Sequence, residues 1–375
     1  MPVNGENSRE ETIRGRNLNS ASSPGLAPGD TLPLVSVVIP AYRCAPFIPQ
    51  AVESTLTQSY PRCETIVVND GSPDTPDLEA ALAPFRDRIH YITKRTGGPS
   101  AARNRGILAA HGKYIAFLDG DDYWSPIHIA KQMNLLLRDP GLDLVYCNCV
   151  LLKDEKPFTG SFSVQPQGPH VTFDALVVED CAIGMSTSVV SREAIVRAGL
   201  FDETFIRCED FEMWLRMSFW GSSIAYHSDA EVFHRVWEHG LSADRLAMKK
   251  DRIRVYEKLA ATLPLSPRQR SAIGKLAADT RRDCDIDILK HLLDAEDYHN
   301  ALVLAGRVNA RSHSWKLTVA HWGLRFAPRL FGRLHRIRSR VVQREYPRRG
   351  VIQEDLISTA LAEDREQLEG ISTGR

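Results

Sequence analysis

The sequence predicts an α/β fold with a Rossmann-like, mostly parallel sheet flanked by helices, followed by a helical C-terminal region. Short β-branched apolar runs alternate with helical stretches from residue 34 to residue 151. Polar turn signals follow these runs, as expected where parallel strands end at one edge of a sheet. After residue 245 the spacing of Leu, Ala and Ile is that of helices.

The first two apolar runs are typical of buried strands. Leu34–Ile39 ends at Pro40, and Glu64–Asn69 stops at the turn signal Asp70-Gly71-Ser72. The further expected strands span residues 88–92, 114–118, 142–151 and 231–235. The expected helices span residues 46–58, 76–83, 100–110, 126–138, with Pro126 in its first turn, and 210–220.

Composition divides the chain into four segments. Residues 1–32 are rich in Ser, Asn, Gly, Pro and charge, and we expect them to be disordered. Residues 33–245 form the expected α/β domain, and residues 246–349 form a helical region with a basic amphipathic stretch. Residues 350–375 form a tail that is acidic from Glu354 to Glu369.

The global composition is that of an ordinary globular protein. Of 375 residues, 43% are hydrophobic, and 47 Lys and Arg residues balance 47 Asp and Glu residues. This balance gives no indication of nucleic-acid binding. No apolar run approaches the roughly 18 residues that cross a bilayer, and the N-terminus has no apolar signal region. We therefore expect a cytoplasmic protein, with a peripheral position on the inner face of the membrane as one option.

Seven cysteines in a long chain do not fit a disulfide framework, because the number is odd. Cys147 and Cys149 lie one residue apart in an apolar run, but no second Cys or His pair stands at zinc-ligand spacing. Reduced thiols are the favoured interpretation.

Three carboxylates follow the strand at residues 114–118, in the sequence Asp119-Gly120-Asp121-Asp122. Carboxylates two residues apart at a strand end can converge on one hard cation, and Mg²⁺ and Mn²⁺ prefer such oxygen ligands. The alternative is an acidic turn that caps the next helix. The strand-end position favours a cation that neutralises a departing diphosphate.

Two further strand-end segments suggest contacts to a nucleotide. Asp70 can accept hydrogen bonds from a ribose or a base, or it can bond to its own turn. Gly97-Gly98-Pro99 stands at the expected start of a helix whose N-terminus favours binding of phosphate. The guanidinium of Arg103 adds several hydrogen-bond donors for the same phosphate. The glycine pattern that binds dinucleotides is absent after the first strand, which argues against an NAD enzyme.

A second acidic site stands at the expected start of the helix at residues 210–220. Glu209 and Asp210 can cap that helix, or Asp210 can act as a general base for an attacking hydroxyl. Trp214 can stack on a sugar or fill the core, and the core is the favoured interpretation.

Five motifs taken together resemble glycosyltransferase family 2, the inverting transferases with a GT-A fold. The resemblance covers about residues 34–245, and each motif alone is weak. The motifs occur in this order: Val37-Val38-Ile39-Pro40-Ala41-Tyr42, Val68-Asn69-Asp70-Gly71-Ser72, Gly98-Pro99-Ser100-Ala101-Ala102-Arg103-Asn104-Arg105-Gly106, Phe117-Leu118-Asp119-Gly120-Asp121-Asp122-Tyr123-Trp124 and Glu209-Asp210-Phe211-Glu212-Met213-Trp214-Leu215-Arg216.

The resemblance implies a nucleotide-sugar donor, with a UDP-sugar favoured and thymidine or guanosine donors left open, and a divalent metal, Mn²⁺ or Mg²⁺. The acceptor would be a glycan or a lipid-linked sugar in cell-envelope polysaccharide assembly. Asp210 would be the catalytic base, and Glu209 and Trp214 are further candidates for acceptor contact or support. The implied donor and metal residues are Pro40, Ala41, Tyr42, Asp70 and Arg103 near the nucleotide, Asp119 at ribose or metal, and Asp121 at the metal.

The sequence departs from the family pattern at three places. Thr96 stands where many members carry Asn, and Cys208 stands where Gly often precedes the acidic pair. Trp237 occupies the position of a family His, which leaves the roles of His234 and His239 open.

Arginines and apolar residues interleave between residues 315 and 349. Such a helix can lie on an anionic membrane, or it can pack its apolar stripe on the catalytic domain. Pro328 should break it.

Two rival functions differ in what they require. A sugar nucleotidyltransferase needs a Gly-rich basic loop after the first strand, where this chain has Pro40-Ala41-Tyr42-Arg43. A catalytically inactive sugar-nucleotide-binding scaffold would tolerate loss of Asp119, Asp121 or Asp210, and all three are present.

Overall fold

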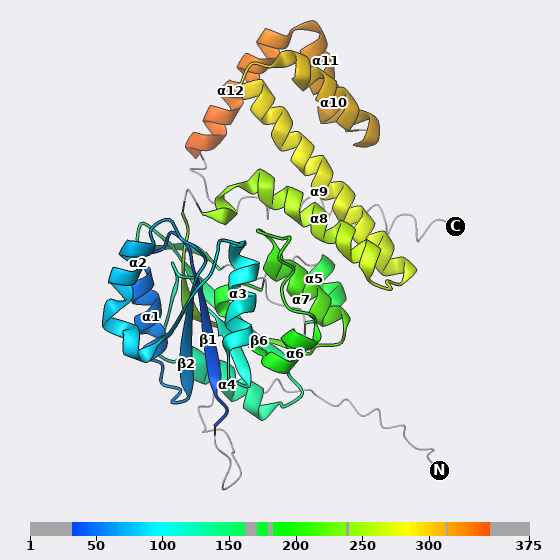
Figure 1. Ribbon diagram of the computed structural model, residues 1–375. Helices are drawn as coiled ribbons and strands as arrows, with labels where there is room; N and C mark the ends of the chain where they lie inside the picture. Colours follow the sequence, from blue (N-terminus) through cyan, green and yellow to red (C-terminus); the bar gives the residue numbers. More distant parts are fainter. Residues whose placement is uncertain (1–31, 162–170, 179–182, 238–239, 313, 346–375) are drawn as a thin grey trace, which may run out of the picture.

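The computed structural model describes residues 32–161, 171–178, 183–237, 240–312 and 314–345. In these residues a nine-stranded sheet is flanked by helices, and a helical region rises from one end of it (Figure 1). This confirms the expected fold class. The segments expected to be disordered or acidic, residues 1–31 and 350–375, lie outside the described residues.

The N-terminal half of the sheet is parallel. Its strands lie in the order β3-β2-β1-β4, and every neighbouring pair is parallel. The elements of this half are β1 (Val35–Ala41), α1 (Ile48–Leu56), β2 (Cys63–Asn69), α2 (Thr75–Leu82), the 3₁₀ segment η1 (Ala83–Arg88), β3 (His90–Thr93), α3 (Gly98–Ala109) and β4 (Tyr114–Phe117).

The second half of the sheet is mixed, unlike the mostly parallel sheet that we expected. Strand β8 lies between β4 and β6 and runs antiparallel to both, whereas β6 and β9 are parallel. The elements here are β5 (Tyr123–Trp124), α4 (His128–Arg138), β6 (Leu144–Lys153), β7 (Lys156–Ser161), α5 (Phe173–Val178), η2 (Met185–Thr187), β8 (Ser188–Ser191), α6 (Arg192–Arg197), α7 (Glu209–Phe219) and β9 (Ile224–Arg235).

Helices cover both faces of the sheet, so its strands are buried on both sides. Alternate residues of β1 belong to different cores: Val38 packs with α3 and α7, and Val37 and Ile39 pack with α1 and α4. This explains why β1 is a continuous apolar run rather than an alternating one. Cys147 and Cys149 are buried in the second of these cores, as free thiols.

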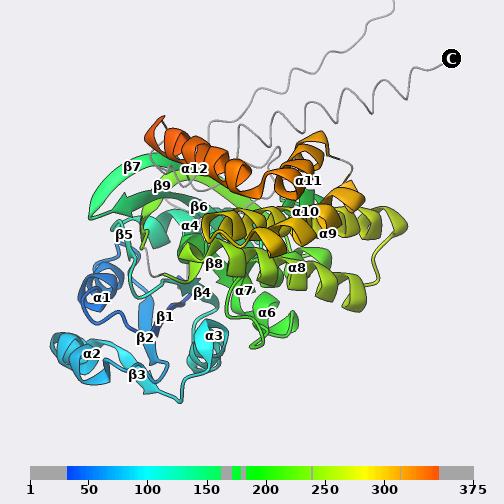
Figure 2. The ribbon, with the colours of Figure 1, turned by 90° about the horizontal axis from the view of Figure 1, so that it is seen from above.

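The helical region continues from the sheet domain through one long helix. Its elements are η3 (Leu241–Ala243), α8 (Arg245–Thr262), α9 (Pro267–Asp294), α10 (Tyr298–Ser312), α11 (Trp315–Phe326) and α12 (Pro328–Glu345). Figures 1 and 2 show α8 and the start of α9 against the sheet domain, and α10 to α12 at the far end of α9. A separate small core joins α9 to α12 at that end.

Two expectations about proline have different outcomes. Pro328 separates α11 from α12 and stands at the first position of α12, so the expected break is confirmed. The expectation for Pro126 was wrong, because α4 begins at His128 with Ile127 as its N-cap. Pairing of β5 with β9 holds the preceding chain extended, and the Ser125 amide donates to the Glu231 carbonyl.

Candidate active site

The N-terminus of α3 is anchored by a buried carboxylate from the end of β2. Asp70 accepts hydrogen bonds from the Gly97 amide at 3.0 Å and the Gly98 amide at 2.7 Å, and it pairs with Lys94 at 2.6 Å. Gly98 has φ of +88°, which favours glycine. Asp70 therefore binds the helix start across the sheet edge, rather than its own turn, and its role toward a nucleotide stays a prediction.

The loop after β1 lies beside this turn. Pro40 and Ala41 are the last residues of β1, and Tyr42 beyond them is 46% exposed. The Ser72 hydroxyl accepts a hydrogen bond from the Arg43 amide at 2.7 Å, which ties the loop to the end of β2. The Thr96 hydroxyl donates a hydrogen bond to the Gly71 carbonyl. The turn after β2 is therefore held in place although Thr96 stands where many family members carry Asn.

Arg103 of α3 joins the two acidic sites that the sequence predicted separately. It is 3% exposed, and its two terminal nitrogens lie 2.7 Å from Asp119 and 2.6 Å from Glu209. Burial lowers the pKa of Arg103, but the negative charges of these two carboxylates have the larger effect and raise it. A permanently charged fork thus holds the end of β4 against the start of α7.

The three aspartates after β4 have different surroundings. Asp122 is fully buried and accepts hydrogen bonds from the Ser186 hydroxyl and the Arg235 amide, which gives it a structural role. Burial and the charges of Asp122 and Asp119 raise the pKa of Asp121 to about 7. Asp119 is 30% exposed at its side chain, although Arg103 holds one of its oxygens.

His234 belongs to this acidic cluster, a role that the sequence left open. Its Nδ1 lies 2.9 Å from Asp122. Burial lowers the pKa of His234, but the nearby charges of Asp122, Asp121 and Asp119 outweigh burial and raise it to about 9. The second candidate, His239, lies outside the described residues.

The acidic pair at the start of α7 is held in a buried environment. Burial raises the pKa of Glu209 to about 7 against the opposing charge of Arg103. Burial also raises the pKa of Asp210, whose Oδ1 accepts from the Phe211 amide at 2.7 Å. Cys208 before them has φ of +58°, which explains why glycine suits this position in the family.

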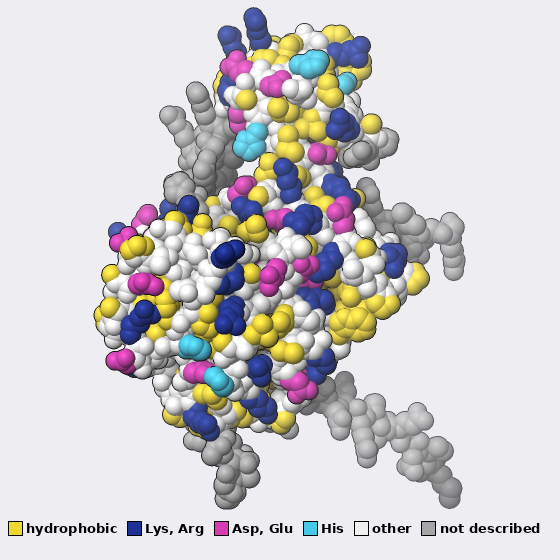
Figure 3. Space-filling model, viewed as in Figure 1, with side chains coloured by type: hydrophobic (Ala, Val, Ile, Leu, Met, Phe, Trp, Pro, Cys, Tyr) yellow, Lys and Arg dark blue, Asp and Glu magenta, His cyan; other side chains and the backbone are white. Residues whose placement is uncertain are grey.

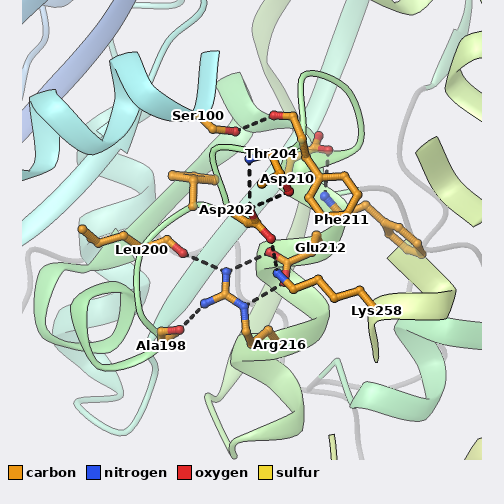
Figure 4. Close-up of polar contacts among 12 residues, drawn as sticks. Ser100, Ala198, Leu200, Asp202, Thr204, Asp210, Phe211, Glu212, Arg216 and Lys258 are labelled. Atoms are coloured by element: carbon orange, nitrogen blue, oxygen red, sulfur yellow. Dashed lines mark hydrogen bonds and ion pairs between the residues drawn. The ribbon is translucent and has the colours of Figure 1, made fainter. Parts of the chain in front are cut away.

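A buried network fixes the helix that carries Asp210 (Figure 4). Glu212 is fully buried and pairs with Arg216 at 2.8 Å and with Lys258 of α8 at 2.8 Å. The Arg216 guanidinium also donates to the Leu200 carbonyl. Trp214 is 1% exposed and donates to the Ile183 carbonyl, so it fills the core and does not stack on a sugar in this structure.

Several residues position the site through contacts that the sequence motifs did not indicate. Ser100 and Asn104 of α3 hold the loop before α7 by hydrogen bonds to Phe205 and Phe201. Ser186 contacts both Asp122 and the Asp119 amide. Each of these contacts joins segments far apart in the chain, so spacing alone could not have revealed them.

The described residues hold no group of three or more His, Cys, Asp or Glu side chains arranged as a metal site. A cation held by Asp119 and Asp121 would therefore need oxygens from elsewhere, such as phosphate or water. The burial of Asp121 beside the charges of Asp122 and Asp119, which His234 only partly offsets, fits such a cation.

The fold has counterparts among solved glycosyltransferases. Staphylococcus aureus TarS, residues 1–349 in complex with UDP, superposes with a TM-score of 0.51 and 17% identity over 66% of this chain and 71% of TarS. The mannosyltransferase PcManGT of Pyrobaculum calidifontis, in complex with GDP-Man and Mn²⁺, superposes with a TM-score of 0.50 and 17% identity over 88% of this chain and 92% of that one. The class is therefore the GT-A fold.

Sequence comparison gives the family. The model for glycosyl transferase family 2 matches residues 36–186. The chain is 30% identical over 214 residues to the Escherichia coli UDP-Glc:alpha-D-GlcNAc-diphosphoundecaprenol beta-1,3-glucosyltransferase WfaP, covering 56% of this chain and 81% of WfaP. The chain belongs to glycosyl transferase family 2.

Other relatives are longer than the matched region. An uncharacterized glycosyltransferase of Rickettsia prowazekii is 32% identical over 209 residues, which cover 54% of this chain and 64% of the relative. The match to a Rickettsia bellii relative covers 27% of that protein.

Proposed function

We propose that this protein is an inverting glycosyltransferase that moves a sugar from a nucleotide-diphosphate sugar, a UDP-sugar, to a hydroxyl of a glycan or lipid-linked acceptor. One observation carries the proposal: Arg103 pairs with Asp119, in the acidic segment suited to a leaving diphosphate, and with Glu209, the neighbour in sequence of the acid Asp210, which is suited to an attacking hydroxyl. The UDP donor and lipid-diphosphate acceptor in the name of WfaP support this choice of substrates.

The donor nucleotide lies along the edge formed by Pro40, Ala41, Tyr42 and Asp70 in this proposal. Tyr42 offers an exposed ring for stacking, and Lys94 offers a cation next to Asp70. Asp119 and Asp121 hold the divalent metal, Mn²⁺ or Mg²⁺, together with the diphosphate. When bound, this metal would neutralise charge on the leaving group.

Asp210 is the general base of the proposed reaction. Its buried position raises the pKa above that of an ordinary aspartate, which makes it a better proton acceptor. The acceptor oxygen forms a bond to the anomeric carbon while the bond from that carbon to the diphosphate oxygen breaks. The acceptor proton moves to Asp210, the nucleoside diphosphate leaves, and the configuration inverts. Glu209, held by Arg103, keeps the start of α7 in place.

Calorimetric titration with UDP, with and without Mn²⁺, tests the donor site. Wild type should bind UDP in a metal-dependent manner, and Asp121→Ala should lose that dependence. Asp87→Ala, an exposed acid in η1, is the matched control and should bind as wild type does. If UDP gives no signal, dTDP and GDP follow. If none of the three nucleotides binds, the result contradicts the proposal and favours an inactive scaffold.

Asp210→Asn tests the assignment of the base. The variant should still bind UDP with Mn²⁺, because Asp210 does not hold the nucleotide. Its rate of sugar transfer, or of donor hydrolysis without acceptor, should fall by about 10²–10⁴-fold, the usual contribution of a general base. Transfer at the wild-type rate would remove Asp210 from the mechanism. Formation of a sugar nucleotide from a sugar phosphate would instead indicate a nucleotidyltransferase.

A further inference from the structure

Two consecutive helices at the C-terminal end leave apolar side chains in solvent. On α11 and α12 seven large apolar residues are each more than half exposed. Their spacing of three or four residues places them along one face of each helix. They are Trp315, Val319, Trp322 and Phe326 on α11, and Leu330, Leu334 and Ile337 on α12. We call these seven residues the outer stripe.

The outer stripe is distinct from the face that these helices use for packing. Leu317 and Leu324 of α11 are buried, and Phe331 of α12 packs beside them, in the small core shared with α9 and α10. The helices therefore already have a core partner on one side. The outer stripe is a second apolar face, so the alternative that these residues pack on the catalytic domain does not account for them.

The positive charge around the outer stripe indicates a negatively charged partner. From Trp315 to Arg344 the sequence holds eight Lys and Arg residues and no Asp or Glu. Lys316, Arg325, Arg329 and Arg333 are exposed among them. Figure 3 shows hydrophobic and basic side chains on this end of the molecule, together with some acidic ones, and the acids Asp294 and Glu296 lie beside His335 and Arg336 of α12. Such a surface complements an apolar layer covered by negative headgroups.

Aromatic side chains concentrate on α11 and strengthen this choice. The Trp322 and Phe326 rings stack, with centroids 5.2 Å apart, and Trp315 lies about two turns before Trp322 on the same stripe. Tryptophan is enriched where membrane meets water. Among the described residues, no helix has the length and apolar character to cross a bilayer. The helices would therefore lie along the surface.

We propose that α11 and α12 dock on an anionic phospholipid membrane through the outer stripe and its flanking arginines. Docking would bring the catalytic domain to the surface where a lipid-linked acceptor resides. The purpose of docking therefore rests on the proposed function. Membrane docking itself requires neither a donor nor turnover, so the two proposals can fail separately.

Flotation of the full chain with vesicles tests the proposal. One set of vesicles is pure phosphatidylcholine, and the other is an equal mixture of phosphatidylcholine and phosphatidylglycerol. The protein should float with the anionic vesicles alone, and added salt should weaken binding. Absence of flotation with both kinds of vesicle would overturn the proposal, whereas intact UDP binding in the same preparation would preserve the proposed function.

Two double variants separate the apolar and the charged contributions. Trp322→Ser with Phe326→Ser should abolish most flotation. Arg329→Gln with Arg333→Gln should lower the partition coefficient about 25-fold, because each basic group near the surface contributes about fivefold. Trp220→Ser is the matched control, because Trp220 is 62% exposed on the catalytic domain. Unchanged circular dichroism establishes that the variants fold. Equal loss in the control would contradict the assignment to the outer stripe.

Other occupants give different results. If a second copy covers the outer stripe, light scattering will show a dimer that the Trp322→Ser and Phe326→Ser variant dissolves, without flotation of the wild type. If residues 346–375 cover it, a chain that ends at Glu345 will float where the full chain does not. Either result overturns the membrane proposal.

Discussion

At the residue scale, the site holds more negative charge than its cations balance. Among the described residues, Arg103 pairs with Asp119 and Glu209, whereas His234 pairs with the buried Asp122 and only partly offsets the charges around Asp121. Burial is the main reason that Asp121 and Glu209 have pKa values raised to about 7, and the charges of neighbouring carboxylates add to it. A bound divalent cation would relieve this repulsion, so binding of metal and ionisation of Asp121 should be linked.

Metal affinity should therefore fall as the pH is lowered through about 7. The raised pKa means that Asp121 takes up a proton near neutrality, and the metal must displace that proton. Above this pH the carboxylate is ionised and no proton competes. Calorimetric titration of Mn²⁺ with UDP should give an affinity about tenfold weaker at pH 6 than at pH 8.

The Asp121→Asn variant is the control for this effect. It should bind Mn²⁺ and UDP weakly at both pH values, because the amide neither titrates nor offers a negative oxygen. An equal pH dependence in the variant would assign the titration to another group. An affinity for Mn²⁺ that rises toward pH 6 in the wild type would contradict the metal assignment itself.

The candidate acids of the site could be predicted because each stands at a strand or helix end within a recognisable motif. The structure brings Asp119 and Glu209 together through Arg103, although they are 90 residues apart in the numbering. The supports could not be assigned, since Ser186 is a single polar residue outside any motif and the sequence left the role of His234 open. Their importance follows only from the hydrogen bonds to Asp122.

At the element scale, strong local patterns predicted the elements of the parallel half well. β1 and β2 are mostly apolar and are buried on both faces over most of their length, and such runs are visible in the sequence. β8 was not predicted, because its four residues Ser188–Ser191 carry two valines between serines. It gains its strand structure from pairing with β4 and β6, which are distant in sequence.

The packing of α3 on β1 depends on the absence of a side chain at Gly106. A Cβ atom there would lie 2.3 Å from Val38 Cγ1, on a strand that cannot move without disturbing the sheet. Gly106→Ala should destabilise the fold by about 1–3 kcal/mol, the usual cost of overpacking. Urea unfolding followed by circular dichroism measures the loss.

Gly274→Ala in α9 is the matched control. It is the same substitution in a helix, but a Cβ atom there would meet nothing within 4 Å. Alanine should therefore stabilise by about 0.5–1 kcal/mol through its higher helix propensity. Equal effects of the two substitutions would mean that α3 does not pack on β1 as closely as described.

At the scale of the whole molecule, α9 belongs to two cores. Ile273 and Ala277 in its first half pack into the catalytic core together with α8, while Leu289 and Leu293 in its second half pack into the core of α10 to α12. The domain boundary expected at residue 245 stays a prediction. Composition and periodicity could not reveal this division, because the helix has one continuous pattern across both cores.

Truncation should separate the two cores. A chain that ends at Arg282 keeps α8 and the first half of α9, and it should fold and bind UDP with Mn²⁺ in the proposed donor site. A chain that ends at Asp244 exposes the catalytic core where Val255, Tyr256 and Leu259 were buried. Its free energy of unfolding should be lower by at least about 4 kcal/mol, since burial of each such side chain contributes about 1.5–3 kcal/mol. Thermal unfolding with and without UDP measures both chains. Cooperative unfolding of the shorter chain at the temperature of the longer one would show that the catalytic domain ends before α8.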